Sequence, residues 1–195
     1  MSFLKKIFTK NPPVEMYRGK ELHTVVHYSP LSQMSEIIDG HLYLGSLRIA
    51  MEEKQLKERG ITDIINASME ERKYKIPVKC MVININDNSD ADISLYFDMV
   101  ADKIDAVKKE NGRVLVHCVA GVSRSATLVI AYLMKYYKMT LKDSHDFVKK
   151  KRSIISPNYG FWNHLIDYEK KLFGKSTVEK KETAKKKDVG YVLYH

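Results

Sequence analysis

Cysteine is scarce in this sequence: among 195 residues there are only two, Cys80 and Cys118. Small secreted domains stapled by disulfides need more, so a disulfide scaffold is excluded and a reducing compartment is favoured. Long apolar runs are also missing. The longest mostly apolar stretch, residues 126–134, falls far short of the about 20 residues that span a bilayer. We therefore expect no stable membrane insertion.

We also expect neither a secretory signal nor N-myristoylation. Phe3, Leu4, Ile7 and Phe8 are interrupted by lysines, unlike the continuous apolar core of a secretory signal peptide. Ser2 stands where N-myristoylation would require glycine. We expect a soluble, cytoplasmic protein, with the nucleus as a second candidate compartment.

Acidic residues are outnumbered, with 24 Asp and Glu against 33 Lys and Arg, for a net charge of +9. Residues 1–22 and 174–195 each carry +3, which leaves +3 for the body. This excess suits acidic phosphorylated partners but specifies none, and no nucleic-acid partner is expected. We predict a basic, poorly ordered tail over residues 1–30, one folded domain over 31–175, and a basic, disordered tail over 176–195.

The most informative segment is HCVAGVSRS, from His117 to Ser125. The five residues between Cys118 and Arg124 can wrap once around a tetrahedral anion, with backbone N–H groups pointing inward. A cysteine and an arginine at this spacing alone would occur in roughly one such chain in ten, but the flanking residues lower the chance to the order of one in a hundred thousand. The segment therefore indicates a phosphate site.

The surroundings of this segment agree. Residues 111–112 suggest a turn, 113–117 a buried strand and 125–137 a core helix. Gly121 suits a loop position with positive φ or a ligand close to the backbone. The alternative is a cysteine packed as a small apolar side chain beside a surface arginine, which the flanking residues disfavour.

Each residue type in the segment has a chemical reason. Cysteine is nucleophilic as thiolate, a few per cent of an ordinary cysteine at pH 7, and inward N–H groups, a helix N-terminus and Arg124 all favour that form. Arg124 can bind two phosphate oxygens with its planar fork. Ser125 is expected to donate to the Cys118 sulfur, to cap the helix, or both. His117 is expected to orient the loop rather than to shuttle protons. The predicted phosphate-lining residues are Val119, Ala120, Gly121, Val122 and Ser123.

Expelling an alcohol or phenol oxygen also needs a proton donor. Asp87, Asp90 and Asp92 follow a predicted strand over residues 80–85, and periodicity alone does not choose among them. Asp92 is a natural N-cap for a helix beginning near Leu95. Asp87, nearest the strand end, is the better candidate.

The chain resembles the cysteine-dependent phosphatases of the protein tyrosine phosphatase superfamily, and among them the small atypical dual-specificity phosphatases. HCVAGVSRSAT is similar to their phosphate-loop signature, IND at 85–87 to their general-acid segment, and SPNYGF at 156–161 to a further family element. The resemblance covers about residues 35–178 and implies a phosphocysteine mechanism. In it Cys118 attacks phosphorus, Asp87 acts as acid and then as base, Ser125 stabilises the leaving thiolate, and Asn158 braces the loop. As a plain helix N-cap, Asn158 is explained equally well.

The resemblance also implies the substrate class. It suggests hydrolysis of phosphotyrosine and phosphoserine or phosphothreonine in proteins, with MAP kinases or their upstream regulators as partners, negative regulation of MAP kinase signalling, and no metal or other cofactor. Val119, Ala120 and Val122 make the loop apolar, whereas related phosphoinositide phosphatases usually place lysines there. The alternatives are a phosphoprotein-binding scaffold with little turnover, or a phosphatase for RNA 5′ ends or lipids.

The expected fold is α/β: a central twisted mixed sheet of four to five strands flanked by helices, in a single catalytic domain of the dual-specificity phosphatase type. Cys80 is expected to be a buried strand cysteine, with an oxidative disulfide to Cys118 as the lesser alternative. The predicted strands are 41–45, 61–66, 80–85 and 113–117, and the predicted helices are 51–59, 95–109, 125–137, 141–151 and 159–173.

Overall fold

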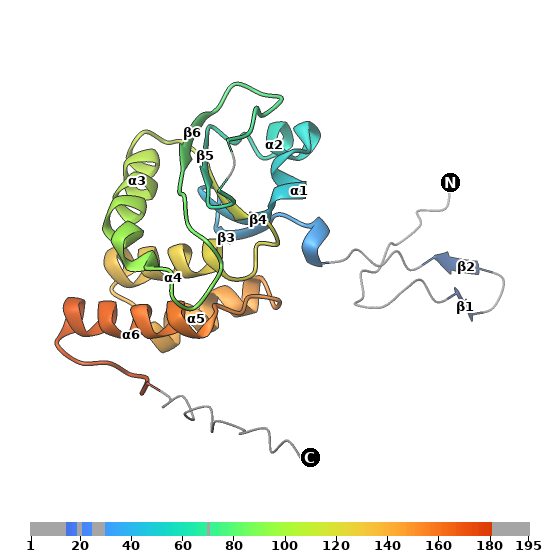
Figure 1. Cartoon of the computed structure of the whole chain (residues 1–195). Coiled ribbons are helices and arrows are strands. Elements are labelled where there is room, and N and C mark those ends of the chain that lie inside the picture. The colour runs from blue at the N-terminus through green and yellow to red at the C-terminus, as the bar shows by residue number, and fades with distance from the viewer. Residues whose placement is uncertain (1–14, 19–20, 25–29, 70, 181–195) are drawn as a thin grey trace, which may run out of the picture.

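The computed structural model describes residues 15–18, 21–24, 30–69 and 71–180. Its centre is a five-stranded sheet in the order β3-β4-β7-β5-β6, flanked by helices (Figure 1). β3 is antiparallel to β4, and the other neighbouring pairs are parallel. The predicted mixed α/β sheet is confirmed. The strands are β3 (Ser35–Ile38), β4 (Leu42–Ser46), β5 (Asp63–Asn66), β6 (Lys79–Val82) and β7 (Val114–Cys118).

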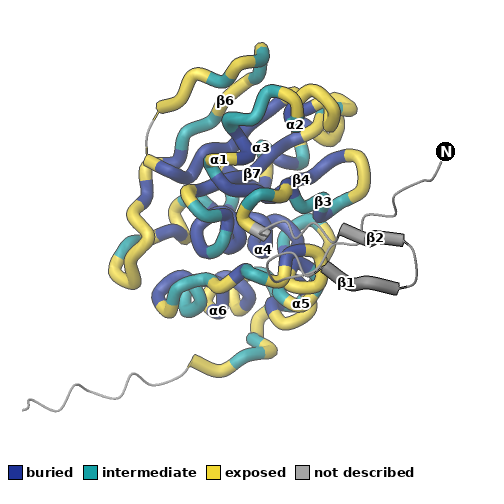
Figure 2. The backbone as a smooth tube through the Cα atoms, turned by 90° about the vertical axis from the view of Figure 1, so that its right-hand side faces the viewer, coloured by how far each residue is buried: buried dark blue, intermediate teal, exposed yellow. Residues whose placement is uncertain are grey.

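Helices cover both faces of this sheet. Successive side chains of a strand point to opposite faces: Val114 and Val116 join the core cluster beneath the larger helices, whereas Leu115 joins the cluster beneath α1 and α2. Figure 2 shows the buried backbone concentrated at the centre of the molecule. The helices are α1 (Leu47–Ala50), α2 (Glu53–Glu58), α3 (Phe97–Lys109), α4 (Arg124–Tyr137), α5 (Leu141–Lys151) and α6 (Tyr159–Phe173), with 3-10 turns η1 (Pro30–Ser32) and η2 (Ile93–Tyr96).

Several predicted boundaries need correction. The predicted helix 51–59 is preceded by the extra short helix α1, which begins where Ser46 Oγ accepts from the Ile49 N–H at 3.4 Å. The predicted strand 80–85 stops at Val82, and beyond it Ile83 still donates its N–H to Asn66 O. β3 was not predicted, because only Ile37 of its four residues is buried and one buried position gives no alternating pattern.

The ends of the chain bear on the predicted tails. Within residues 1–30, β1 (Glu15–Arg18) and β2 (Glu21–Thr24) form a separate antiparallel pair, and most of the remaining residues lie outside the described part. After α6, Ser176 Oγ and the Thr177 N–H both donate to Glu169, at 2.6 and 2.8 Å. Contacts with the domain thus continue past residue 175. Within the described residues, no helix is long and apolar enough to cross a membrane.

Candidate active site

The predicted phosphate loop, residues 119–123, joins the end of β7 to the start of α4. Cys118 pairs with Ser46 at the end of β4, and the Leu47 N–H donates to Val119 O at 3.1 Å. On the other side the Ala67 N–H, just beyond β5, donates to His117 O at 2.8 Å. The loop therefore lies at the carboxyl edge of the parallel strands, where α/β folds bind ligands, and the N-terminus of α4 faces it with positive partial charge.

The Cys118 sulfur is buried, with 1% of the residue exposed. It accepts hydrogen bonds from the Gly121 N–H and from Ser125 Oγ, each at 3.2 Å. Hydrogen bonds to an ionised acceptor favour the ionised form. The predicted contact between Ser125 and Cys118 is confirmed, and both donors point at the sulfur.

Gly121 has the backbone conformation expected of it, with φ +67°. A Cβ there would lie 2.4 Å from Gly45 O and 2.9 Å from Arg152 Nη2. Only glycine fits, because the loop packs directly against the end of β4.

Arg124, the first residue of α4, is 8% exposed. Its Nη1 donates to Ile85 O at 3.3 Å, and its Nε lies 3.4 Å from Asp87 Oδ2. The guanidinium therefore joins the phosphate loop to the segment after β6, which carries the predicted acid.

Asp87 is the aspartate that the fold brings to the loop. Its Oδ1 accepts from Ser123 Oγ at 2.7 Å and from Asn158 Nδ2 at 2.9 Å. Asp92 accepts from the Ser94 N–H at 3.0 Å and caps η2, the 3-10 turn that leads into α3, rather than α3 itself. Asp90 is exposed in the same segment. Of the three candidates, only Asp87 contacts the loop and Arg124 in the described structure.

Asn158 caps a helix and contacts both Asp87 and the phosphate loop. Its Oδ1 accepts from the Phe161 N–H at 3.0 Å and caps α6, while its Nδ2 holds Asp87. Its own N–H donates to Ser123 Oγ at 3.1 Å. The cap of α6 is therefore also the brace between the acid and the loop.

Two further features of this region are not visible in the sequence. A Cβ at Gly160 would lie 1.9 Å from Ser89 O, so the first turn of α6 packs backbone against backbone on the segment that carries Asp87. Arg152, at the end of α5, donates from Nε to Gly121 O at 2.8 Å. In the sequence, Arg152 looks like one more cation after a run of lysines.

His117 is fully buried. Its Nδ1 lies 3.3 Å from Cys118 O and its Nε2 lies 2.8 Å from Tyr74 Oη. A carbonyl only accepts, so Nδ1 carries the proton and Nε2 accepts from Tyr74. Burial lowers the pKa of His117 to about 4, and the nearby charge of Arg72 adds to this against the opposing effect of the Cys118 carbonyl. The neutral ring suits the predicted orienting role.

The rim of the loop is apolar, with Val119 54% exposed and Ala120 and Val122 partly exposed.

Residues 42–171 match the family model described as "Dual specificity phosphatase, catalytic domain". The chain belongs to the dual-specificity phosphatase family. It is a dual-specificity protein phosphatase, and its substrates are phosphoproteins.

Individual relatives agree. Human dual specificity protein phosphatase 14 is 48% identical over 147 residues, which cover 75% of this chain and 74% of that protein. The structure of human DUSP28 has a TM-score of 0.68 and 31% identity, covering 71% of this chain and 94% of that one. The structure of a human tyrosine phosphatase-like serine/threonine/tyrosine-interacting protein has a TM-score of 0.65 and 36% identity, covering 70% of this chain and 95% of that one.

Cys80 of this dual-specificity phosphatase lies on the edge strand β6 and is exposed, not buried as predicted. It pairs with Ile64, which pairs with Leu115. Cys80 is therefore separated from Cys118 by two strand spacings across the sheet, about 9.6 Å, and by three residues along the strands, about 10 Å. A disulfide needs Cα atoms within about 7 Å, so this fold does not allow the Cys80–Cys118 bond that was the lesser alternative.

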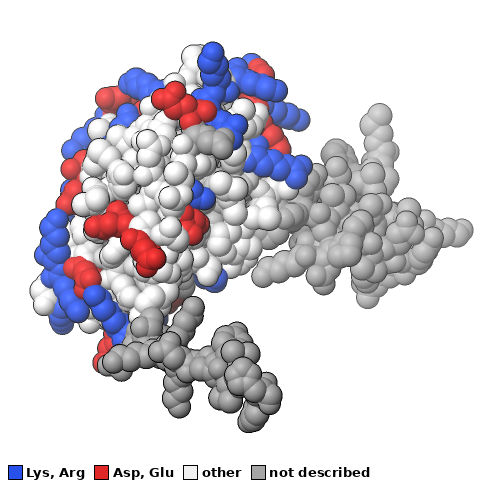
Figure 3. All heavy atoms as spheres, viewed as in Figure 1, with Lys and Arg blue, Asp and Glu red and all other residues white. Residues whose placement is uncertain are grey.

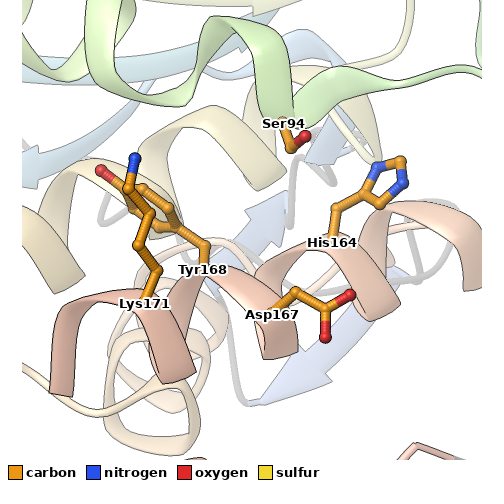
Figure 4. A pocket seen from close by; sticks show the side chains of 5 residues that line it. All are labelled: Ser94, His164, Asp167, Tyr168 and Lys171. Carbon is orange, nitrogen blue, oxygen red and sulfur yellow. The ribbon is translucent and has the colours of Figure 1, made fainter. Parts of the chain in front are cut away.

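A cavity of about 200 Å³ lies away from the phosphate loop, between η2 and α6 (Figure 4). It is lined by Ser94, His164, Asp167, Tyr168 and Lys171. Lys171 Nζ lies 2.8 Å from Asp98 Oδ2, and Asp167 Oδ2 lies 2.6 Å from Lys180 Nζ. These lining charges are already paired, and the pocket contains none of the residues predicted for catalysis.

Proposed function

We propose that Cys118, Arg124, Asp87 and Ser125 hydrolyse phosphate monoesters in two steps. The supporting observation is a buried sulfur that accepts two hydrogen bonds at the base of a loop that ends at Arg124, with Asp87 of the segment after β6 beside that arginine. In the first step the Cys118 thiolate attacks phosphorus, the P–O bond breaks, and Asp87 gives its proton to the departing oxygen.

In the second step the phosphocysteine is hydrolysed. Asp87, now a carboxylate, takes a proton from a water that attacks phosphorus, and the P–S bond breaks. The products are inorganic phosphate and the Cys118 thiolate, which Ser125 Oγ stabilises from 3.2 Å. No cofactor takes part in either step.

The remaining loop residues bind and position. We assign the backbone N–H groups of residues 119–123 to the equatorial phosphate oxygens, and the Arg124 fork to two of those oxygens as negative charge shifts in the transition state. Neutral His117 orients the end of β7, and Asn158 holds Asp87 and the loop together.

We further propose that MAP kinases or their upstream regulators are substrates. The protein would then be a negative regulator of MAP kinase signalling. We also propose that it acts in the cytoplasm and in the nucleus. Membership in the dual-specificity family supports this, as does the uncharged loop rim, which suits protein better than a lipid headgroup or an RNA end. In Figure 3, basic side chains near α3 and α2 are interspersed with acidic ones. It is therefore the net charge of +9, rather than a single basic patch, that would attract acidic phosphorylated segments.

A substrate-trapping pull-down tests this assignment. The Asp87→Ala variant should retain phosphoproteins from a cell lysate, and vanadate, a phosphate analogue, should release them; Arg124→Met is the matched variant that should not bind. Phosphorylated MAP kinases or their activators among the released proteins would support the proposal. A released set without them would contradict it.

A binding scaffold is the rival function, since the interacting protein described above as phosphatase-like shares the fold. Cys118, Arg124 and Asp87 are all present and in contact with the loop, which favours turnover. Steady release of inorganic phosphate from a chromogenic aryl phosphate would exclude the scaffold, and binding without release would favour it.

A further inference from the structure

Arg152 is a buried cation behind the phosphate loop, with 2% of the residue exposed. Its Nε donates to Gly121 O at 2.8 Å and its Nη2 to Ala120 O at 3.2 Å. On the other side its Nη1 donates to Gln33 O at 3.0 Å. One planar guanidinium thus holds two successive loop carbonyls and the segment before β3.

The two sides of one peptide group connect Arg152 to the nucleophile. The carbonyl of Ala120 and the N–H of Gly121 belong to the same planar peptide and point in opposite directions. Nη2 of Arg152 binds the oxygen at 3.2 Å, and the N–H binds Cys118 Sγ, also at 3.2 Å. Hydrogen bonds in such a chain polarise one another, so a cation on the carbonyl strengthens the N–H as a donor to sulfur.

We propose that Arg152 is a positioning residue that stabilises the Cys118 thiolate through the Ala120–Gly121 peptide and keeps the N–H groups of the loop turned toward the phosphate. The proposal rests on the assignment of Cys118 as nucleophile. Arg152 acts through the backbone and is not a catalytic residue, since the Ala120 carbonyl that it holds points away from the N–H that binds the sulfur.

The electrostatics agree with this geometry. Burial lowers the pKa of Arg152, and the charge of Cys118 opposes that effect. Arginine keeps its charge even when buried, because its ordinary pKa lies far above neutral pH.

Substitutions can separate the positive charge of Arg152 from the planar geometry of its guanidinium group. Arg152→Met removes both. Arg152→Lys keeps a positive charge, but a single ammonium on a flexible stem replaces the rigid fork that holds both carbonyls. Lys151→Met is the matched control, because Lys151 is the neighbouring cation, is 39% exposed and lies 3.6 Å from Asp39 Oδ1 at the surface.

The first experiment measures the rate of Cys118 alkylation by iodoacetamide over roughly pH 5 to 9, in a Cys80→Ser background and without substrate. Arg152→Met should move the midpoint of the curve upward by about one pH unit. Arg152→Lys should leave it within about 0.3 unit of wild type, and Lys151→Met should leave it unchanged. An unchanged curve in Arg152→Met would overturn the stabilisation of the thiolate.

The second experiment measures the binding of inorganic phosphate by its inhibition of aryl-phosphate hydrolysis. Arg152→Lys should weaken phosphate binding by about tenfold, and Lys151→Met should not. If Arg152→Met does not fold, Arg152→Lys decides: wild-type phosphate binding would overturn the proposal, and weakened binding with an unchanged alkylation curve would support it. Failure of the nucleophile assignment is seen separately, as turnover that persists in Cys118→Ser.

Discussion

Asn158 Nδ2 lies 2.9 Å from Asp87 Oδ1, while the Oδ1 of the same amide caps α6. The helix that closes the domain is thereby tied to the acid that the reaction needs. The two contacts use opposite ends of one side chain, so substitution can separate stability from chemistry.

We expect Asn158→Ser to keep the cap and lose the contact with Asp87, and Asn158→Ala to lose both. The alanine variant should be less stable than the serine variant by about 1 kcal/mol, measured by urea unfolding. Both should show a similar fall in kcat for aryl phosphates with poor leaving groups. Equal stability of the two variants would show that the Asn158 cap does not stabilise the domain. An unchanged kcat in both variants would show that Asn158 does not position Asp87.

The choice of acid can be tested with matched amides. Asp87→Asn should lower kcat by about 10²- to 10⁴-fold for a poor leaving group and much less for a good one, because a good leaving group departs without a proton. Asp90→Asn and Asp92→Asn should stay close to wild type. A larger loss in either of those two variants would show that Asp87 is not the acid.

The close packing of Gly160 against Ser89 predicts that a substitution in α6 will affect catalysis by Asp87. Alanine in place of a helical glycine usually stabilises a protein by about 0.4–1 kcal/mol, but here its Cβ would lie 1.9 Å from Ser89 O. Gly160→Ala should therefore destabilise the domain and lower kcat most for poor leaving groups. Lys170→Ala, at an exposed position of the same helix, should do neither. A stabilised, fully active Gly160→Ala variant would refute the close packing.

His117 predicts how stability depends on pH. Its pKa is lowered from 6.5 to about 4 in the folded protein, so the unfolded chain binds the extra proton between these values. The free energy of unfolding should fall as pH drops from about 6.5 toward 4, with His117 contributing up to about 3 kcal/mol of the loss. In urea titrations, His117→Gln should show a shallower fall. An equally steep fall in that variant would place the pH dependence elsewhere.

Local signals made the central site predictable. The loop from Cys118 to Arg124 is one contiguous segment between a strand and a helix, and Asp87 was singled out because it is the aspartate nearest the strand end. Tyr74 and Arg152 were not predicted, because their contacts with His117 and Gly121 span 43 and 31 residues. Sequence periodicity reports which face of an element is buried, but not which distant element covers it.

In the fold, too, some features could be predicted from the sequence and others could not. The helices α4, α5 and α6 end where the sequence predicts, since the pattern of buried positions in each helix spans several turns. Cys80 was expected to be buried because it lies in an apolar strand, but strand order places β6 at the sheet edge. Whether a strand lies at the edge or at the centre of a sheet depends on how the strands assemble, which the sequence of one strand does not show.

The phosphocysteine itself is the most direct test of the proposed reaction. Asp87→Asn slows the hydrolysis step, so rapid acid quenching during turnover of an aryl phosphate, followed by peptide mass spectrometry, should find one phosphoryl group on the peptide that contains Cys118. The same peptide from Cys118→Ser should carry none, and that variant should have lost its turnover. A phosphoryl group on another residue, or turnover that persists in Cys118→Ser, would contradict the account.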